Sequence, residues 1–485
     1  MPTYNKKSLG LNQKPSPKSY KSPSIARQRL RTQTAQQLNT HAMNSTDQDN
    51  PIHDASNHDT STANAVYNRT SHAYNEVAGL LAKRLTQETQ GEVLFGVGDR
   101  GRYATDASIY QETPVGVFVP RSDTDVAHAL AICRDLKVPI VSRGGGTSQC
   151  GQTVGAGLVV DFSKHLRHAS HLDLDKGQIT VQPGMVLDHL NAQLKQHKLW
   201  YPVDVSTAAQ ATLGGMAGNN SCGSRSIAYG NMVHNVAGMS AWLADGQSLY
   251  WGLMNDQQTS TQAHSIGTWL QGLVNDLKPD LEAHWPKVLR RVAGYNLDIF
   301  HPQSERPYTQ DNQVNLAHLL VGSEGTLGIT RSLDLHLSEL PTHKVLGIVN
   351  FPSFHQAMDA AQHIVKLDHN HDLTAVELVD RTMVELALKN PAFESTMRTA
   401  LLGDPAAILL VEFAGTDLGA LKSQLQRLQD LMGELGLPGS VVCMSEPQPQ
   451  RQLWEVRKAG LNIMMSLRGD GKPVSFIEDC AVPLE

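Results

Sequence analysis

The stretch Val141-Ser-Arg-Gly-Gly-Gly-Thr-Ser-Gln-Cys-Gly-Gln-Thr-Val-Gly-Ala-Gly157 is dense in glycine, and apolar runs at residues 138–141 and 158–161 flank it. This pattern predicts a strand, a glycine loop and a second strand. Glycine permits positive φ angles and lets the backbone approach a bound group closely. Successive exposed N–H groups form a site for anions. We therefore expect the loop to hold a phosphorylated ligand, and a plain glycine-rich turn is the alternative.

Two familiar phosphate-binding motifs do not fit this stretch. A dinucleotide fingerprint needs G-x-G-x-x-G at the start of a helix, whereas the Gly144-Gly145-Gly146 run lacks that spacing and precedes a strand pattern. A Walker A loop needs a lysine after its last glycine, and Gln152 stands at that position. The sequence therefore excludes both motifs.

Length and composition narrow the class of protein. The chain has 485 residues, enough for two or three domains, and a formal net charge of −6, which argues against nucleic acid as the main partner. No apolar run is long enough for a transmembrane helix, and the basic start lacks the apolar core of a signal peptide. Residues 1–72 are polar and predicted to be a disordered leader, whose contact with a membrane would be peripheral at most.

The cysteines and histidines give no metal signature. The five cysteines form no C-x-x-C pair and suit a reducing cytoplasm rather than a zinc site or an iron–sulfur cluster. His369 and His371 form a close pair in a polar stretch that is typical of a solvated turn. We therefore predict no metal ligands in this chain and a cytoplasmic location.

Two further stretches of small residues resemble the first in character: residues 206–224 and residues 322–329. The last lies between an apolar run at 319–321 and a strand predicted at 332–337. Three such stretches, each flanked by strands, indicate an extended ligand with a diphosphate. Other predicted elements include a helix at 74–85, a strand at 115–120, a helix capped by Ser122, a hairpin at 171–181, a helix at 186–196 and a strand at 236–244.

The pattern changes after residue 341. Strands are predicted at 345–351, 375–378 and 407–413, and helices at 353–367, 381–388 and 417–435. Such an alternation indicates a separate α+β domain. A last strand signal at 474–477 stands close to the end of the chain.

Several motifs together resemble one family. They are PRSDTDVAHAL, RGGGTS, VQPGMVLDHL, TLGGMAGNNSCGS, AYG and GSEGTLGIT, followed by LWEVRKAGL and FIEDCAVPLE. The chain is similar to FAD-linked oxidases of the vanillyl-alcohol-oxidase (PCMH-type) fold, in the D-2-hydroxy-acid dehydrogenase branch. The resemblance implies an α+β fold, with a two-lobed FAD-binding domain at residues 73–340 and an incomplete ferredoxin-like cap domain at 341–485.

More narrowly, the chain resembles the front half of long bacterial members, in which an iron–sulfur region follows the FAD part. We therefore expect a fragment or a truncated product. An iron–sulfur domain or a quinone-linked carrier would then be the electron acceptor.

The resemblance also implies which residues hold FAD. The pyrophosphate is expected at Arg143, Gly144, Gly145, Gly146, Thr147, Ser148, Gly151, Gln152 and Thr153. The flavin and ribityl path is expected at Pro183, Gly184, Thr212, Gly214, Gly215, Asn219 and Gly223. Val236, Gly325, Gly328 and Ile329 are expected near the adenine end or at the closure of the pocket. Relatives with covalent flavin often carry a histidine in the first loop, where Thr147 stands, so we expect non-covalent FAD.

The implied reaction oxidises a D-2-hydroxy acid such as lactate, glycolate or 2-hydroxyglutarate. An arginine should grip the carboxylate while hydride passes to flavin N5. Arg291 and Arg457 are candidates, and a structural salt bridge is the alternative for each. Asp479, with Glu478, either orients a catalytic group or is an ordinary acid at a strand end, and the base is expected beyond Glu485. An alcohol or sugar oxidase and a non-catalytic flavin-binding subunit remain as other functions.

Overall fold

A computed structural model describes residues 76–465, except 293, 305, 310, 312 and 369–371, and in addition residues 469, 481 and 482. These residues belong to one unit of closely contacting elements. The predicted leader, the pair His369 and His371, the strand signal at 474–477 and Asp479 lie outside the described residues.

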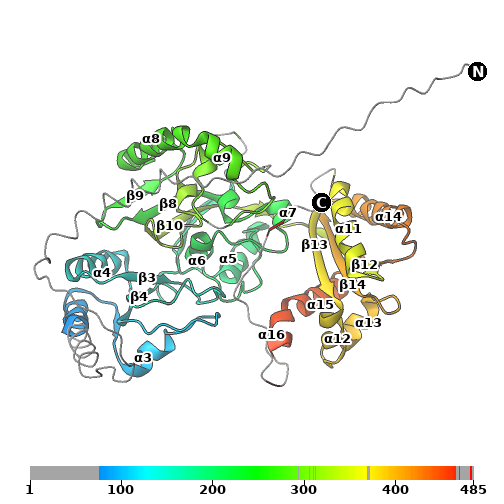
Figure 1. Ribbon diagram of the computed structural model, residues 1–485, viewed down its shortest axis with the longest axis horizontal. Coiled ribbons are helices and arrows are strands. Elements are labelled where there is room, and N and C mark those ends of the chain that lie inside the picture. The colour runs from blue at the N-terminus through cyan, green and yellow to red at the C-terminus, as the bar shows by residue number, and fades with distance from the viewer. Residues whose placement is uncertain are drawn as a thin grey trace, which may run out of the picture. The chain divides into compact units, whose positions relative to one another are not determined.

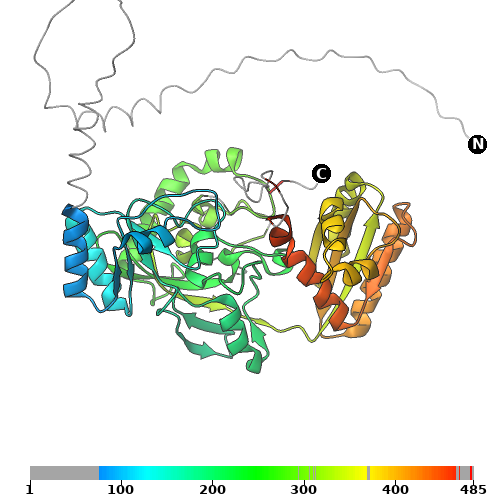
Figure 2. The same ribbon diagram turned by 90° about the horizontal axis from the view of Figure 1, so that it is seen from below.

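The first sheet contains both strands that border the first glycine loop. Its order is β1-β2-β4-β3, and β2, β4 and β3 run parallel. A helix at residues 76–88 and the helix α4 lie side by side (Figure 2), and their apolar side chains form one core with the sheet. The Ser122 hydroxyl accepts a hydrogen bond from the Asp125 amide at 3.2 Å, so the predicted cap of α4 is confirmed. The elements are β1 (Glu92–Leu94), α3 (Val97–Arg102), β2 (Gly116–Val119), α4 (Asp123–Leu136), β3 (Ile140–Arg143) and β4 (Leu158–Asp161).

The second sheet is antiparallel, with the order β5-β6-β10-β8-β9. Figure 1 shows it beside the helices α6, α8 and α9. Its strands are β5 (Ala169–Asp173), β6 (Gln178–Val181), β8 (Val236–Trp242), β9 (Ser248–Trp251) and β10 (Ile329–His336). The helices of this region are α5 (Leu187–Leu194), α6 (Leu213–Asn219), α7 (Ser226–Tyr229), α8 (Thr261–Asp276), α9 (Lys278–His284) and α10 (Ala317–Leu320). A two-stranded pair, β7 (Leu199–Trp200) and β11 (Ser338–Glu339), leads out of the region.

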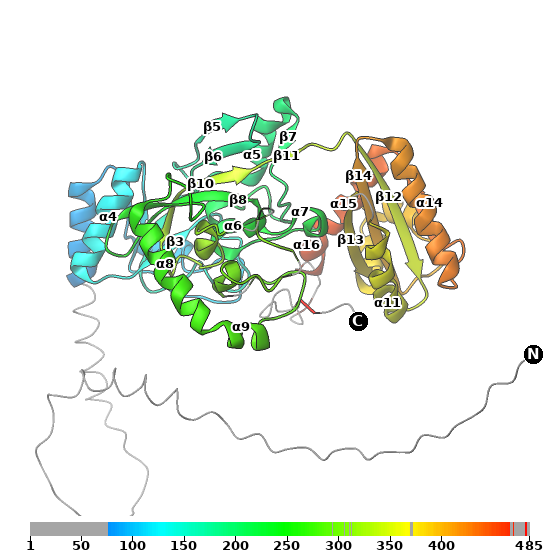
Figure 3. The same ribbon diagram turned by 90° about the horizontal axis from the view of Figure 1, so that it is seen from above.

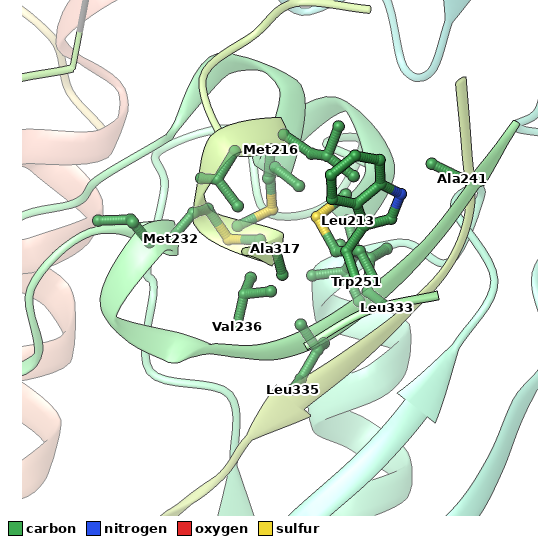
Figure 4. Packing of buried hydrophobic residues seen from close by; sticks show 14 of the residues in the cluster. Leu213, Met216, Met232, Val236, Ala241, Trp251, Ala317, Leu333 and Leu335 are labelled. Carbon is green, nitrogen blue, oxygen red and sulfur yellow. The ribbon is translucent and has the colours of Figure 1, made fainter. Parts of the chain in front are cut away.

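The helix α6 is fixed by its apolar side onto this sheet. Leu213 and Met216 of α6 are buried in the same cluster as Val236 of β8 and Leu333 of β10, as Figure 4 shows. Removing this surface from water anchors the helix, so the small residues Gly214, Gly215 and Gly218 lie on its remaining surface. The second glycine stretch thereby has a rigid support.

Residues 343–465 build a third sheet that is buried on both faces. Its order is β13-β14-β12-β15. Side chains of α11 and α14 pack on one face, and side chains of α12, α13 and α15 pack on the other. Figure 3 shows α14 and α15 on either side of this sheet. Burial on both faces explains the continuous apolar runs in the strands. The elements are β12 (His343–Phe351), α11 (Phe354–Ile364), β13 (Leu373–Asp380), α12 (Arg381–Leu388), α13 (Glu394–Ala400), β14 (Ala407–Gly415), α14 (Leu418–Glu434), β15 (Val441–Met444), α15 (Pro447–Lys458) and α16 (Gly460–Met465).

The prediction that strands flank all three glycine stretches is wrong for the third stretch. The apolar run before the third glycine stretch belongs to the helix α10, because a short apolar run has no period that separates a strand from a buried helix. That stretch is therefore flanked by a helix and the strand β10. In the described part of the chain, no helix combines the length and the hydropathy needed to cross a membrane.

Candidate functional site

A cavity of about 1510 Å³ brings the three glycine stretches together. Its walls include Gly144–Ser148 of the first stretch, Thr212–Gly223 residues of the second, and Glu324 and Gly325 of the third. Residues of the C-terminal domain, among them Glu377 of β13 and Arg457 of α15, line the same cavity. The volume exceeds the roughly 300–1,000 Å³ typical of small-molecule sites, as an extended ligand together with a substrate would require.

The first glycine loop follows the chain at residues 210–212 so closely that side chains are excluded. A Cβ on Gly144 would overlap the Thr212 hydroxyl, and a Cβ on Gly145 would overlap the Gln210 carbonyl oxygen. Gly146 has a φ of 65°, a conformation that glycine adopts at little cost. The loop therefore depends on glycine for sequence-distant contacts and for its own turn.

Polar groups around the loop lack partners within the described residues. None of the backbone N–H groups of residues 144–149 donates a hydrogen bond to another described residue. The hydroxyl of Thr212 and the side-chain amide nitrogen of Asn220 are buried without a partner, and both residues line the cavity. Buried polar groups are normally satisfied, so this arrangement fits a bound ligand that accepts hydrogen bonds, such as a diphosphate.

Hydrogen bonds connect the third stretch to the other two. The Gly322 amide donates to the Ala217 carbonyl at 2.8 Å, and the Glu324 amide donates to the Gly218 carbonyl at 2.9 Å. The Gln152 side chain reaches Glu324 Oε1 at 3.4 Å. Glu324 has a φ of 51°, which a non-glycine residue adopts only when its surroundings hold it there. The three stretches thus form one connected wall.

Most of the predicted cofactor residues line this cavity. They are Arg143, Gly144, Gly145, Gly146, Thr147, Ser148, Gln152, Thr153, Pro183, Thr212, Gly214, Gly215, Asn219, Gly223, Gly325, Gly328 and Ile329.

Three predicted cofactor residues lie behind the cavity wall. A Cβ on Gly151 would come within 2.7 Å of the Tyr110 ring, and one on Gly184 would overlap the Phe162 carbonyl oxygen. Val236 is buried in β8, with its carbonyl oxygen 3.1 Å from His318 Nε2. These three residues shape the wall through packing.

The two predicted arginine anchors have different surroundings. Arg457 of α15 lines the cavity, and its Nε and Nη2 donate to Glu377 Oε2 at 3.0 and 2.8 Å. Arg291 does not belong to the described cavity wall. Its guanidinium lies 4.4 Å from the centre of the Trp285 ring and 3.8 Å from Asp298, and it also contacts Asn296. The preceding residue, Arg290, lines the cavity instead.

A buried ionic cluster at the cavity was not found from the sequence. Arg225 donates to Asp204 at 2.6 Å and, through two nitrogens, to Glu412 of β14 at 2.7 and 2.8 Å. Lys344 Nζ lies 3.6 Å from Glu412. The one available signal in the sequence was Glu412, an acidic residue inside the apolar strand β14. A buried charge of this kind needs a partner of opposite charge.

The pKa values of this cluster follow from its burial and its pairing. Burial would raise the pKa of Glu412, but the hydrogen bonds and charges of Arg225 and Lys344 outweigh it and lower the pKa to about 2. Burial lowers the pKa of Lys344, although Glu412 opposes this effect. The pair Arg225 and Glu412 is therefore ionised.

Two families of known domains match the chain. Residues 114–250 match the family described as FAD binding domain, and residues 340–485 match the family described as FAD linked oxidases, C-terminal domain. The chain belongs to the FAD-linked oxidase family. Its FAD-binding domain contains the first two glycine stretches, and its C-terminal domain contributes Arg457, Glu377 and Glu412 to the cavity.

Similar proteins agree with this assignment. The chain is 30% identical to a D-2-hydroxyglutarate dehydrogenase of Pantoea ananatis, over 84% of this chain and 42% of the relative. It is 27% identical to the glycolate oxidase subunit GlcD of Bacillus subtilis, over 82% of this chain and 71% of the relative. A solved structure of alkyldihydroxyacetonephosphate synthase, at 16% identity, shares the fold with a TM-score of 0.55 over 77% of this chain and 61% of that chain.

The chain spans 40–42% of the length of the D-2-hydroxyglutarate dehydrogenases that it resembles. FAD is the cofactor of this family, and the cavity fits it. The unpartnered amides of residues 144–149, with Thr212 and Asn220, supply donors for its acceptor groups. The prediction of FAD is thus confirmed, while the assignment of individual contacts stays a prediction.

Proposed function

We propose that the protein is an FAD-dependent dehydrogenase that oxidises a D-2-hydroxy acid to the 2-oxo acid. The observation that carries this proposal is the shared cavity of the glycine stretches and Arg457. A donor-rich loop for the cofactor and a guanidinium for a carboxylate thereby open into one space. The relatives named as dehydrogenases of 2-hydroxyglutarate and as a glycolate oxidase subunit support the same substrate class.

Different residues of the chain bind the cofactor and the substrate. In this proposal the amides of residues 144–149 bind the diphosphate of FAD, and Thr212 and Asn220 donate further hydrogen bonds to the cofactor. Arg457 binds the substrate carboxylate and thereby orients the carbon that carries the hydroxyl group. Bound FAD would supply the hydride acceptor for the Cα hydrogen, and the hydroxyl proton would pass to a general base, so that C–OH becomes C=O.

Arg457 is suited to this role by the way Glu377 holds it. Glu377 accepts from Nε and Nη2 through a single carboxylate oxygen, which fixes the plane of the guanidinium. Nη1 has no hydrogen-bond partner among the described residues and is available to a ligand in the cavity that Arg457 lines. A planar donor held in this way loses little freedom when a carboxylate binds.

Three finer points belong to the proposal. FAD is bound without a covalent bond, because Thr147 stands where covalent relatives often have histidine. An iron–sulfur domain or a quinone-linked carrier takes the electrons. The cytoplasm is the compartment, because the five cysteines are odd in number and widely spaced in the sequence and form no C-x-x-C pair.

Anaerobic flavin reduction tests the proposal. The purified full-length protein is mixed with D-lactate, glycolate or D-2-hydroxyglutarate in the absence of oxygen, and the visible flavin absorbance is followed. Bleaching by at least one acid, and release of the flavin by acid precipitation, are the expected results. A flavin that no D-2-hydroxy acid bleaches, or steady peroxide formation from a simple alcohol or sugar, would overturn the assignment.

A further inference from the structure

We infer that Arg290 is a specificity-determining residue that binds a second carboxylate of the substrate, so that the site favours dicarboxylic over monocarboxylic hydroxy acids. This inference rests on the proposed function, because it takes Arg457 as the anchor of the first carboxylate. Sequence reasoning singled out the neighbouring Arg291. The structure turns Arg291 toward Trp285 and Asp298 and leaves Arg290 at the cavity.

The charge of Arg290 is not balanced by any described carboxylate. Its Nη1 contacts Cys222 Sγ at 3.3 Å and Ser226 Oγ at 3.4 Å, and neither contact is with a carboxylate. The other arginines and lysines of the wall are satisfied in other ways. Arg225, Lys344, Arg457 and Lys458 pair with described carboxylates, Arg143 donates to backbone carbonyl groups, and Arg451 is exposed to water. A half-buried guanidinium without a counter-charge strongly favours an anionic ligand.

The position of Arg290 is fixed by the segment that it contacts. Ser226 starts the short helix α7, whose first carbonyl groups accept hydrogen bonds from Arg306 at 2.6–3.2 Å. Arg225, the residue before it, is held by Asp204 and Glu412. The segment that Arg290 contacts is therefore held in place, although Arg290 itself belongs to an irregular stretch of the chain.

The same segment connects Arg290 to the side of the cavity that carries Arg457. The Arg225 guanidinium lies 5.2 Å from the centre of the Trp454 ring, and Trp454 precedes Arg457 by one turn of α15. Arg290 and Arg457 thus line the same cavity from two different domains. A substrate with one carboxylate engages one of them, and a substrate with two carboxylates engages both.

Binding of non-reactive acids tests this inference without turnover. Glutarate and pentanoate have the same carbon chain and differ in the second carboxylate. Their affinity for the FAD-bound chain is measured by calorimetry. The wild type is expected to bind glutarate more tightly, and R290Q should lose ~10- to 100-fold of its glutarate affinity but less than ~3-fold of its pentanoate affinity.

Two further variants keep the test decisive. R451Q removes an exposed arginine of the same cavity wall and should change both affinities by less than ~3-fold. R290K keeps the charge and should retain part of the preference for glutarate. Equal wild-type affinities for the two acids, or an equal loss of both in R290Q, would overturn the inference. Failure of the proposed function appears separately, as a flavin that stays oxidised although glutarate binds.

Discussion

Arg225 of the FAD-binding domain and Glu412 of the C-terminal domain form a two-pronged ion pair, with N···O distances of 2.7 and 2.8 Å. The Glu412 side chain is 1% exposed, and the Arg225 side chain is 14% exposed. Two charges can remain buried only while they compensate each other. The pair is therefore one of the contacts that join the two domains beside the cavity, together with the packing of Arg225 on Trp454 and of Ile227 on the C-terminal core.

We expect Glu412→Gln to destabilise the protein by ~3–5 kcal/mol, because Arg225 and Lys344 would lose their common carboxylate. The free energy of unfolding from chemical denaturation measures this effect. In the double variant R225M/E412L no buried charge of the pair is left, so it should recover part of the loss. A double variant less stable than Glu412→Gln would contradict the argument.

Gly144→Ala should abolish most FAD binding. Its Cβ would overlap the Thr212 hydroxyl, so the loop must move away from the wall that it follows. A loss of ~10- to 100-fold in FAD affinity is expected from the cost of such crowding. Fluorescence titration with FAD measures it. Gly98→Ala, in α3, is the matched control, since a Cβ there meets nothing within 4 Å; equal affinities of the two variants would refute the prediction.

Glu377→Gln should raise KM for the hydroxy acid by ~3- to 10-fold and leave kcat within ~2-fold, because the guanidinium of Arg457 would lose its fixed orientation. Steady-state kinetics with an artificial electron acceptor provide both constants. Glu455→Gln removes the partner of Lys458 on the same helix and should leave both constants unchanged. A fall in kcat at constant KM would place Glu377 in a different role.

Stability should fall as the pH drops below 6.5. Burial lowers the pKa of His318 to about 4 and that of His234 to about 3. Above pH 6.5 both residues are neutral in the folded and unfolded chain. Between pH 6.5 and about 4 the unfolded chain binds protons that the folded chain does not, so each histidine costs ~1.4 kcal/mol per pH unit.

Denaturant unfolding between pH 7.5 and 5 checks this slope. His318→Gln should show a shallower dependence than the wild type, whatever its stability at pH 7.5. His264→Gln, which changes an exposed residue of α8, should keep the wild-type slope. Parallel curves for the wild type and His318→Gln would show that His318 does not titrate on unfolding.

The sequence correctly predicted those helices and strands for which the spacing of apolar residues and the capping residues indicate the same element. The strand at 158–161, the helix behind Ser122 and the helix at 381–388 appear as β4, α4 and α12. The glycine stretches also predicted which segments meet, because a run of glycines indicates that another part of the backbone or a ligand lies close to the loop. The family resemblance predicted the cofactor.

The orientation of side chains in irregular segments could not be predicted in the same way. Arg290 and Arg291 lie in a loop without a period, so nothing in the sequence decides which of the two faces the cavity. The pairing of Arg225 with Glu412 joins residues 187 positions apart, and only the packed domains bring them together. Asp479 lies outside the described residues, and its role stays a prediction.

The contact between Gly144 and Thr212 also restricts how this protein can evolve. A side chain at position 144 fits only if position 212 carries a residue smaller than threonine. That smaller residue alone would leave a gap in the cavity wall. Neither change is favourable alone. We expect the two positions to vary together or not at all over evolutionary time, so that two segments far apart in the chain are inherited as one unit.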